Sequence, residues 1–394
     1  MSILLAPSSV AKPGFVRWLG VLAVMLGIFA IVTTEILPIG LLTAIGADFT
    51  VSDGMAGLMM TMPGLLAAIS APVVSVAGAR VDRKHLLIVC TLLLVAANLI
   101  AAVAPVFWMV LASRVLLGIT IGGYWSIAAG LASRLVPPEA AARATAVIFA
   151  AVPLGSVLGV PVGTFIGDIA GWRAAFVVLA ILSAAVLALL ACAVPALPAH
   201  QELGWSTLRT GLTAAGTRFA LLATLLIVTA QFGTYTYVTP FLEQVTGVGN
   251  VTALLLIYGI AGIAGNFLGG NLVGRSPRAA LGAAATLMAA ALLLLPVFGH
   301  WEFAAAALLT VWGIGYGGIP VILQTWFATA VPDHAEVSST LFTASFQATF
   351  CAGALAGGLL LDRTSPSTVL VCGGAIAIAV LVICLSDLSE KLAH

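Results

Sequence analysis

Twelve apolar segments, each long enough to cross a lipid bilayer, follow one another along this chain of 394 residues. An α-helix rises about 1.5 Å per residue, so about 20 apolar residues span the roughly 30 Å of hydrocarbon in a bilayer. The predicted spans cover residues 18–46, 54–77, 86–104, 107–133, 144–167, 174–194, 219–242, 251–273, 279–299, 303–329, 337–361 and 364–386. With 62% hydrophobic and 7% charged residues, the chain has too little polar surface for a water-soluble domain. The sequence therefore predicts an all-α, multi-pass protein whose surroundings are the lipid bilayer.

Charged and reactive residues are few, and their spacing excludes several classes of function. The net charge is +1, from 15 basic and 14 acidic residues scattered between the apolar segments, which is unlike a nucleic-acid-binding protein. The five cysteines form no CxxC or Cys/His spacing of a metal site, and no GxxxxGK(S/T) sequence indicates that ATP is the energy source. No GxSxG or HExxH motif points to an enzyme. We therefore expect no cofactor, no metal and no catalysis.

The Lys and Arg residues between the spans are distributed unevenly. An even number of spans places both termini on one side of the membrane, and that side holds Lys12, Arg17, Arg80, Arg83, Lys84, Arg134, Arg143, Arg209, Arg218, Arg275, Arg278 and Lys391. The opposite side holds only Arg173 and Arg363. Short basic loops remain in the cytoplasm, so we expect both termini to be cytoplasmic. The first apolar segment is too long for the core of a cleaved signal peptide, and we expect it to remain as the first helix.

The two halves of the chain repeat each other. At an offset of 195 residues, segment 114–123 aligns with segment 309–318, and three glycines of each segment fall in register. A Val-Pro pair follows both segments, at residues 136–137 and 331–332. Duplicated six-helix bundles are typical of a large class of transporters. We therefore predict an N-terminal six-helix bundle at 1–197, a cytoplasmic linker at 198–217 and a C-terminal six-helix bundle at 218–394.

Several motifs of the N-terminal half carry a family resemblance. Segment 78–84, GARVDRK, resembles the GxxxD(R/K) loop motif of the major facilitator superfamily, and segment 114–118, RVLLG, resembles its RxxxG motif. Segment 153–163, PLGSVLGVPVG, is similar to the Gly/Pro-rich motif of its proton-driven antiporters, and segment 171–176, GWRAAF, is similar to the GWRxxF that opens the sixth span. The C-terminal half departs from the family pattern, because Gly274 stands where a second loop motif would have aspartate.

A narrower resemblance concerns one branch of this superfamily. Segments 33–42 (TTEILPIGLL), 122–126 (GGYWS) and 134–138 (RLVPP) look like the bacterial drug:proton antiporter branch that includes sugar and purine ribonucleoside efflux pumps. The resemblance implies an inner-membrane protein of two pseudo-symmetric bundles that exports a small molecule in exchange for protons, and we expect it to be a monomer. We predict a small polar substrate, with purine ribonucleosides first and sugars second. The alternatives are export of lipophilic drugs and, outside transport, a membrane sensor or scaffold.

Glu35 and Arg114 carry the two formal charges that lie deep within the predicted spans. Each would cost about 2.5 to 3.5 kcal/mol or more near the bilayer centre, so we expect both to face an interior cavity or each other. One hypothesis is proton coupling, because burial favours the neutral acid whereas an approaching guanidinium favours the carboxylate. The alternative is a permanent Glu35–Arg114 ion pair that fixes helix packing. Pro38 lacks an amide donor one turn beyond Glu35, and we expect it to let that helix bend.

Polar and aromatic side chains within the spans are candidates for binding substrate. These are Trp125, Gln231, Tyr235, Asn266, Gln324 and Gln347. Trp125 lies eleven residues, or three helical turns, after Arg114, so the two side chains share one helix face. An indole is suited to stacking on a flat purine or on the apolar face of a sugar, but in a helix it is also an ordinary packing residue. The amides would bind a polar substrate if they face one cavity, and the alternative for each is hydrogen bonding between helices.

A third group of residues has predicted roles in gating and conformational change. It consists of Gly78, Asp82, Arg83, Arg134, Pro153, Gly155, Gly159, Pro161 and Gly163. The glycines and prolines of the fifth span are predicted to form a hinge or a tight contact between the bundles, with ordinary helix packing as the alternative. Asp82 and Arg83 are predicted to lock the cytoplasmic side, through Arg134 or a helix N-terminus. A purely topogenic role is the alternative for Arg83.

Overall fold

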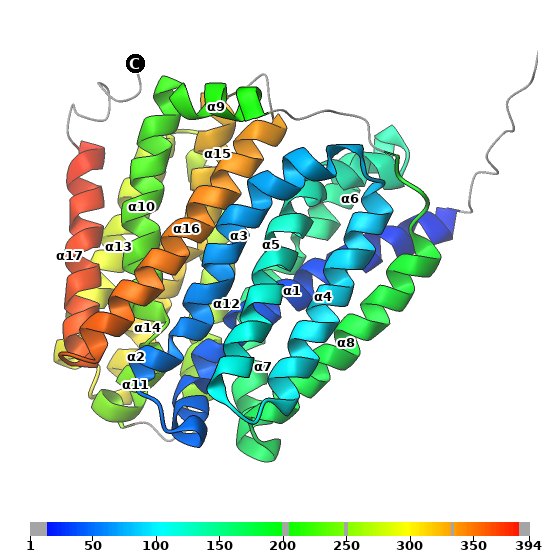
Figure 1. The fold of residues 1–394 in the computed structure, drawn as a ribbon. Helices are drawn as coiled ribbons and strands as arrows, with labels where there is room; N and C mark the ends of the chain where they lie inside the picture. The colour runs from blue at the N-terminus through cyan, green and yellow to red at the C-terminus, as the bar shows by residue number, and fades with distance from the viewer. Residues whose placement is uncertain (1–13, 199–204, 248–250, 332–334, 386–394) are drawn as a thin grey trace, which may run out of the picture.

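The computed structural model describes residues 14–198, 205–247, 251–331 and 335–385, and most of these are helical (Figure 1). The first half contains α1 (Gly14–Phe49), α2 (Asp53–Ala56), α3 (Leu58–Ala77), η1 (Gly78–Arg80), α4 (Arg83–Val103), α5 (Phe107–Leu135), α6 (Pro138–Phe149), α7 (Ala151–Ala170) and α8 (Trp172–Ala193). The second contains α9 (Trp205–Thr213), α10 (Ala215–Tyr235), α11 (Val238–Phe241), η2 (Leu242–Thr246), α12 (Val251–Val273), α13 (Pro277–Phe298), α14 (Glu302–Gly317), α15 (Ile319–Ala330), α16 (Ala335–Leu361) and α17 (Pro366–Leu385). Within the described ranges they form twelve candidate membrane spans, which confirms the predicted all-α fold.

Three of the twelve spans consist of two consecutive helices, α2 with α3, α6 with α7 and α14 with α15, and a proline lies just after the junction in the last two. α6 ends at Phe149, and Pro153 follows four residues later in the first turn of α7. Proline has no amide proton and its ring crowds the carbonyl four residues earlier, so the helix is interrupted at that point. In the second half, α14 ends at Gly317 and Pro320 lies in the first turn of α15. The sequence analysis gave each of these two as one span, and in the structure a proline lies just after the junction of its two helices.

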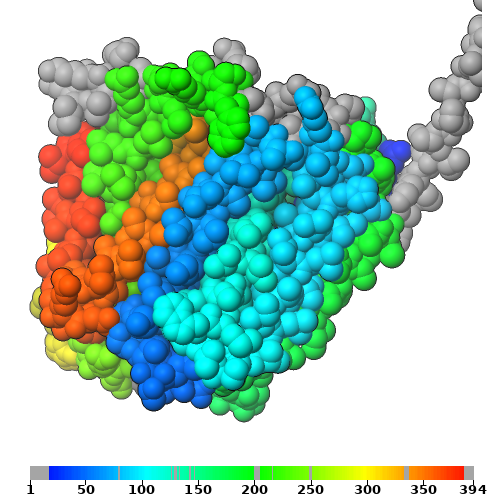
Figure 2. Space-filling model, in the orientation of Figure 1, coloured from blue at the N-terminus to red at the C-terminus, as the bar shows by residue number. Residues whose placement is uncertain are grey.

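The two halves meet along two pairs of long helices. α3 lies against α16, and α7 lies against α12. Figure 1 shows α9 at one end of the bundle and α2 with α11 at the other, and we call these the α9 end and the α2 end. The space-filling view in Figure 2 shows α3, in blue, and α16, in orange, in contact along the visible face. At the α2 end, Tyr237 and Val369 of the second half share an apolar core with residues of the first half.

The glycines that align between the halves occupy equivalent helix contacts. A Cβ atom on Gly118 of α5 would lie 2.6 Å from the carbonyl oxygen of Pro63, so α5 packs directly on the backbone of α3. A Cβ atom on the aligned glycine, Gly313 of α14, would overlap the carbonyl oxygen of Tyr258 on α12. α3 and α5 are the second and fourth spans, and α12 and α14 belong to the eighth and tenth. The repeat in the sequence therefore corresponds to one backbone-to-backbone contact formed twice.

α9 is a short helix within the predicted linker, and it packs on the second half. Its buried Leu208 belongs to an apolar cluster with Val337 and Leu341 of α16. A Cβ atom on its other buried residue, Gly211, would lie 2.5 Å from Cγ1 of Val337. Residues 199–204 of the predicted linker lie outside the described residues. The two chain ends, which the sequence predicts to be cytoplasmic, also lie outside them.

Candidate functional site

Glu35 on α1 and Arg114 on α5 are the two charged side chains that are buried among those the structure describes. Glu35 exposes 7% of its surface and Arg114 exposes 1%. Removing one partner of a buried charge costs about 3 to 5 kcal/mol, because the remaining charge is left without compensation. The groups that contact these two side chains therefore determine what they do.

Arg114 hydrogen-bonds the backbone of α1. Its Nη1 donates to the carbonyl oxygen of Thr34 at 2.9 Å. In a regular helix that oxygen would accept from the amide of residue 38, but Pro38 has no amide proton. The guanidinium therefore donates to a carbonyl oxygen that Pro38 leaves without a donor, and α1 continues past the proline as a helix. Nε and Nη2 of Arg114 have no hydrogen-bond partner, and the guanidinium lies 4.8 Å from the ring centre of Phe176.

The carboxyl group of Glu35 reaches across the boundary between the halves. Nε2 of Gln347 on α16 donates a 3.0 Å hydrogen bond to Oε1 of Glu35. Tyr316 of α14 interacts electrostatically with the same carboxyl group. The direct Glu35–Arg114 ion pair considered from the sequence is not formed, because Arg114 bonds to the backbone of Thr34 while the Glu35 side chain reaches α16. A buried carboxyl group is thus placed at the contact between two bundles.

More buried polar groups surround α1 at Thr34. Nδ2 of Asn98 on α4 donates to Oγ1 of Thr34 at 3.2 Å, and it also lies 3.5 Å from Oγ of Ser183 on α8. Oδ1 of Asn98 has no partner, although the residue is fully buried. An unsatisfied buried donor or acceptor costs about 1 to 3 kcal/mol. The free donors of Arg114 and the free acceptor of Asn98 therefore favour any rearrangement that gives them partners.

Two of the predicted substrate residues belong to an aromatic cluster in the second half. Nε2 of Gln231 donates to the hydroxyl of Tyr258 at 2.8 Å, and its Oε1 accepts from Nε1 of Trp312 at 2.8 Å. The rings of Tyr235 and Tyr258 stack with their centres 4.5 Å apart. Gln231 therefore has both polar atoms engaged by protein groups, as in the alternative of hydrogen bonding between helices. Its two hydrogen bonds join α10 to the rings of Tyr258 on α12 and Trp312 on α14.

The sequence interpretation missed Trp312 and Tyr316, although the internal repeat contains a signal for both. At the offset of 195, Trp312 aligns with Leu117 and Tyr316 with Ile121. A polar aromatic residue in one half thus stands where the other half has an aliphatic residue. Such an asymmetry between duplicated helices indicates a position that serves more than packing.

The other predicted substrate residues do not gather around Glu35. Trp125 is partly buried in the core of the first half, and its ring lies 6.1 Å from that of Phe149. Asn266 is partly buried on α12, and Gln324 is exposed on α15. Gln347 is the predicted substrate residue that contacts Glu35, and it does so as a hydrogen-bond donor to the protein.

The glycine face of α7 packs against α1. Cβ atoms on Gly155 and Gly159 would lie 3.0 Å from Val32 and 3.2 Å from Thr33, and one on Gly163 would overlap Leu37. The sequence interpretation predicted a hinge or a tight contact between the bundles, with ordinary helix packing as the alternative, and the structure places these glycine contacts within the first half. The reason is geometric, because residues four apart share one helix face and that face meets α1. Pro153 and Pro161 belong to the same helix, Pro161 in its interior.

A different face of α7 meets the second half. A Cβ atom on Gly259 of α12 would lie 3.0 Å from Cα of Val157. The hydroxyl of Thr252 on α12 also donates to Oγ1 of Thr164 at 2.9 Å. α7 therefore connects α1, which carries Glu35, with α12, which carries Tyr258.

The loop motif at the α9 end binds the start of the linker. Asp82 caps α4 by accepting from the amide of Lys84 at 2.8 Å, and its two oxygens accept from the amide of Leu197 at 3.0 and 3.1 Å. Nη1 of Arg83 donates to the carbonyl oxygen of Gly78 at 2.7 Å. Asp82 thus caps the helix that it begins, and its described hydrogen bonds remain within the first half.

Arg134 completes this arrangement. Its Nη2 donates to the carbonyl oxygen of Pro198, next to the residue that Asp82 holds. Partial burial and the repulsion from Arg83 lower the pKa of Arg134, and the attraction of Asp82 opposes that shift. Three of the predicted gating residues therefore lie together where the chain leaves the first half.

At the α2 end, a carboxylate of the second half is held by the first half. Asp362, directly after α16, accepts from Oγ of Ser52 at 2.9 Å and from the amide of Gly54 at 3.0 Å. Oγ1 of Thr43 donates to Oε1 of Glu243 at 3.1 Å. The sequence interpretation gave these residues no role, because nothing in the sequence indicates which loops of the two halves meet.

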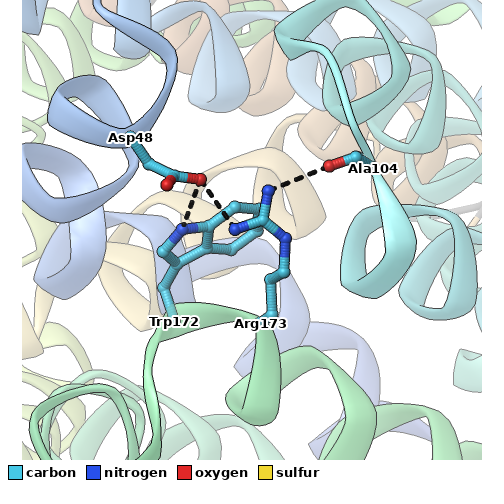
Figure 3. Close-up of polar contacts among 4 residues, drawn as sticks. All are labelled: Asp48, Ala104, Trp172 and Arg173. Atoms are coloured by element: carbon cyan, nitrogen blue, oxygen red, sulfur yellow. Dashed lines mark hydrogen bonds and ion pairs between the residues drawn. The ribbon is translucent and has the colours of Figure 1, made fainter.

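Arg173 joins the ends of three helices of the first half at the α2 end (Figure 3). Its Nη1 lies 2.7 Å from Oδ2 of Asp48 on α1, and its Nη2 donates to the carbonyl oxygen of Ala104, after α4, at 3.0 Å. Nε1 of Trp172 donates to the same carboxylate at 3.3 Å. The GWRAAF segment thus fixes the end of α1 relative to α4 and α8.

Comparisons with known proteins agree with this architecture. The model of the Major Facilitator Superfamily matches residues 22–347. The chain is 35% identical over 353 residues to the "transcription regulatory protein OpdE" of Pseudomonas aeruginosa, with 88% of each chain covered. It is 32% identical over 380 residues to the "purine ribonucleoside efflux pump NepI" of Salmonella paratyphi A, with 95% of this chain and 94% of the relative covered.

Solved structures show the same fold. A bacterial homologue of the human lysosomal transporter Spinster, in an inward-facing and unoccupied conformation, has a TM-score of 0.70 at 17% identity, with 97% of each chain covered. The peptide transporter POT in complex with sulfate has a TM-score of 0.75 at 12% identity, with 95% of this chain and 94% of that chain covered. The chain is therefore a multi-pass inner-membrane transporter and not an enzyme, and it belongs to the major facilitator superfamily.

Proposed function

We propose that this transporter exports a small polar metabolite, with purine ribonucleosides first, in exchange for protons. The observation that carries the proposal is the position of Glu35, a buried carboxyl group that contacts the second bundle through Gln347. A carboxyl group at such a contact is suited to coupling, because its proton changes the charge that the contact must bury.

The two protonation states of Glu35 fit different surroundings. Burial against α16 favours the neutral acid, since an ionised carboxylate loses its hydration there. If the bundles separate around Glu35, the carboxyl group can lose its proton and turn toward Arg114, whose Nε and Nη2 lack acceptors. A carboxylate next to those donors would form charge-assisted hydrogen bonds. Alternation between these surroundings would bind a proton in one conformation and release it in the other.

The choice of substrate rests on the aromatic cluster and on the relatives. Tyr235, Tyr258 and Trp312 lie together in the second half, near the boundary that Tyr316 and Glu35 share. Aromatic rings favour flat, polar ligands, such as a purine base, by stacking. The Salmonella relative is named as a purine ribonucleoside efflux pump, which agrees with this preference. Sugars are the second candidate, and lipophilic drugs are the third.

The orientation in the membrane follows from the basic residues. The α9 end carries Arg83, Lys84 and Arg134, so we place this end in the cytoplasm, together with both termini. The hydrogen bonds of Asp362 and Glu243 then lie on the outer side. In this assignment the polar contacts between the halves lie on the outer side, at Glu35 and, between the hydroxyls of Ser75 and Thr340, toward the cytoplasmic end.

Counterflow in proteoliposomes tests the function. Vesicles loaded with inosine, a sugar or a lipophilic drug are diluted into the labelled compound, with and without an imposed pH gradient. We expect saturable inosine exchange, and accumulation driven by the gradient. Saturable exchange of the drug without any exchange of inosine would reverse the ranking of substrates, and the absence of exchange for all three would favour a sensor or scaffold.

Glu35→Gln separates transport from coupling. This variant should retain inosine exchange but lose accumulation driven by the pH gradient, because its amide cannot release a proton. Glu302→Gln, at an exposed position in the first turn of α14, is the matched control and should behave as the wild type. Gradient-driven accumulation at the wild-type level in Glu35→Gln would remove Glu35 from coupling.

A further inference from the structure

The amide oxygen of Gln347 is a buried acceptor that receives no hydrogen bond from the described residues. Nε2 of this residue donates to Oε1 of Glu35 at 3.0 Å, whereas its own Oε1 has no hydrogen-bond partner. The side chain exposes 5% of its surface, so bulk water does not satisfy this oxygen. A carbonyl oxygen in that position needs a donor, and the acid to which Nε2 is already bonded can become one.

A protonated carboxyl group supplies that donor. A primary amide and a carboxylic acid can form a cyclic pair, in which the amide N–H donates to the acid carbonyl and the acid O–H donates to the amide oxygen. The first of these bonds is present, and protonation of Oε2 of Glu35 would provide the second. An ionised Glu35 would leave Oε1 of Gln347 without a donor and next to a negative charge.

Reversing the amide of Gln347 also calls for a proton on Glu35. Exchanging its oxygen and nitrogen would bring two acceptor oxygens within 3.0 Å of each other. A contact of that kind requires a proton between the oxygens, and that proton again belongs to Glu35. The reversed orientation therefore requires the neutral acid. In the described orientation an ionised Glu35 would keep the bond from Nε2, and the neutral acid would in addition give the amide oxygen its donor.

The other polar groups near Glu35 are compatible with this pairing. Tyr316, on α14, lies near enough to the carboxyl group to interact with its charge, and no hydrogen bond joins these two side chains. Arg114, from α5, donates to the carbonyl oxygen of Thr34. α3 crosses α16 at this level, where a Cβ atom on Gly64 would lie 2.9 Å from the backbone oxygen of Gln347, and it adds no charge there. Among the described side chains, Gln347 is the one that donates a hydrogen bond to the carboxyl group itself.

We propose that Gln347 is a positioning residue that recognises the protonated form of Glu35 and joins the two bundles only when the proton is bound. This inference rests on the proposed coupling role of Glu35. It adds the group that converts the proton into a contact between α1 and α16. Loss of the proton removes one hydrogen bond of the pair and leaves a buried acceptor unsatisfied, so the bundles separate there.

Distance measurements between spin labels test the proposal. In a cysteine-free background, labels at Val81 and Thr329 report the separation of the halves at the α9 end, and labels at Val106 and Phe303 report it at the α2 end. In the wild type, the ratio of the described conformation to the alternative should rise as the pH falls, by up to about tenfold per pH unit, the limit for one linked proton. Gln347→Leu should reduce this response to less than about twofold per unit.

Two further variants define the outcome. Glu35→Gln can form an amide–amide pair with Gln347 that does not depend on a proton, so the ratio of its two conformations should not change with pH. Gln244→Leu, at an exposed glutamine of η2, should respond to pH as the wild type does. A wild-type response in Gln347→Leu, together with uncoupled transport in Glu35→Gln, would overturn the role of Gln347 and leave the proposed function intact. Coupled transport in Glu35→Gln would overturn the proposed function itself.

Infrared spectroscopy gives a second measurement if Gln347→Leu does not fold. The acid carbonyl band that Glu35→Gln removes belongs to protonated Glu35. Gln347→Asn, whose shorter side chain cannot reach the acid, should shift that band to higher frequency because the carbonyl loses its hydrogen bond. An unchanged band would contradict the pairing.

Discussion

The Arg114 guanidinium on α5 donates a hydrogen bond to the Thr34 carbonyl oxygen on α1, one residue before Glu35. That oxygen is free because Pro38 has no amide proton. Arg114, of the RxxxG segment, therefore provides the hydrogen bond that Pro38 cannot donate within α1. The interaction fixes the backbone from which the Glu35 side chain leaves α1.

Pro38→Ala should weaken the dependence on Arg114. The introduced alanine has an amide proton that would restore the helical hydrogen bond to Thr34, so the cost of Arg114→Gln should be smaller in the Pro38→Ala background than in the wild type. We expect a coupling free energy of about 0.5 to 3 kcal/mol from the unfolding of the four proteins in detergent. Additive effects of the two substitutions would show that the proline and the arginine act independently.

Gly317→Ala should destabilise the second half. The new Cβ atom would overlap the carbonyl oxygen of Gly262, and this backbone cannot yield without separating α12 from α14. We expect a loss of about 1 to 3 kcal/mol, measured by thermal unfolding. Gly270→Ala is the matched control, because the nearest atom, Cγ1 of Val321, lies 3.9 Å from its Cβ position. The control should be neutral or slightly stabilising, since alanine favours the helix.

Arg173→Ala should cost more than Asp48→Asn. The Arg173–Asp48 pair is 40% and 42% exposed, and ion pairs of that kind contribute about 0 to 1 kcal/mol. Arg173 also donates to the carbonyl oxygen of Ala104, which Asp48→Asn leaves intact. Thermal unfolding of both variants in low and high salt checks this order. A larger loss in Asp48→Asn, removed by salt, would instead assign the stability to the charge pair.

Asp82→Asn and Asp82→Ala separate capping from gating. Asparagine can cap α4 and accept from Leu197 with one oxygen, so Asp82→Asn should unfold close to the wild-type temperature. Asp82→Ala removes the cap and should cost about 1 kcal/mol or more. If Asp82 also gates transport through its charge, inosine exchange should slow in both variants. Wild-type exchange in Asp82→Asn would limit Asp82 to a structural role.

The sequence predicts those features of the molecule that depend on the residues of a single helix. The twelve spans follow from apolar length, and the burial of Glu35 and Arg114 follows from the cost of charge in lipid. The aligned glycines also predict the duplication, because a missing side chain matters wherever two backbones meet. These features are properties of a segment and of the bilayer around it.

Contacts between the halves could not be predicted in the same way. Gln347 lies 312 residues after Glu35, and Asp362 lies 310 residues after Ser52. A helical repeat shows which side chains share a face but not which face of another bundle they meet. For this reason the sequence did not predict that Gln347 contacts Glu35 or that the α7 glycines pack on α1.

The backbone contact between α12 and α14 has a consequence for the aromatic cluster. No side chain separates these helices at Gly317 and Gly262, so they cannot slide past each other without breaking the contact. Tyr258 belongs to α12 and Trp312 to α14, and their ring centres lie 5.5 Å apart. The two rings should therefore keep their spacing throughout the transport cycle, so that the second bundle moves as one rigid body around them.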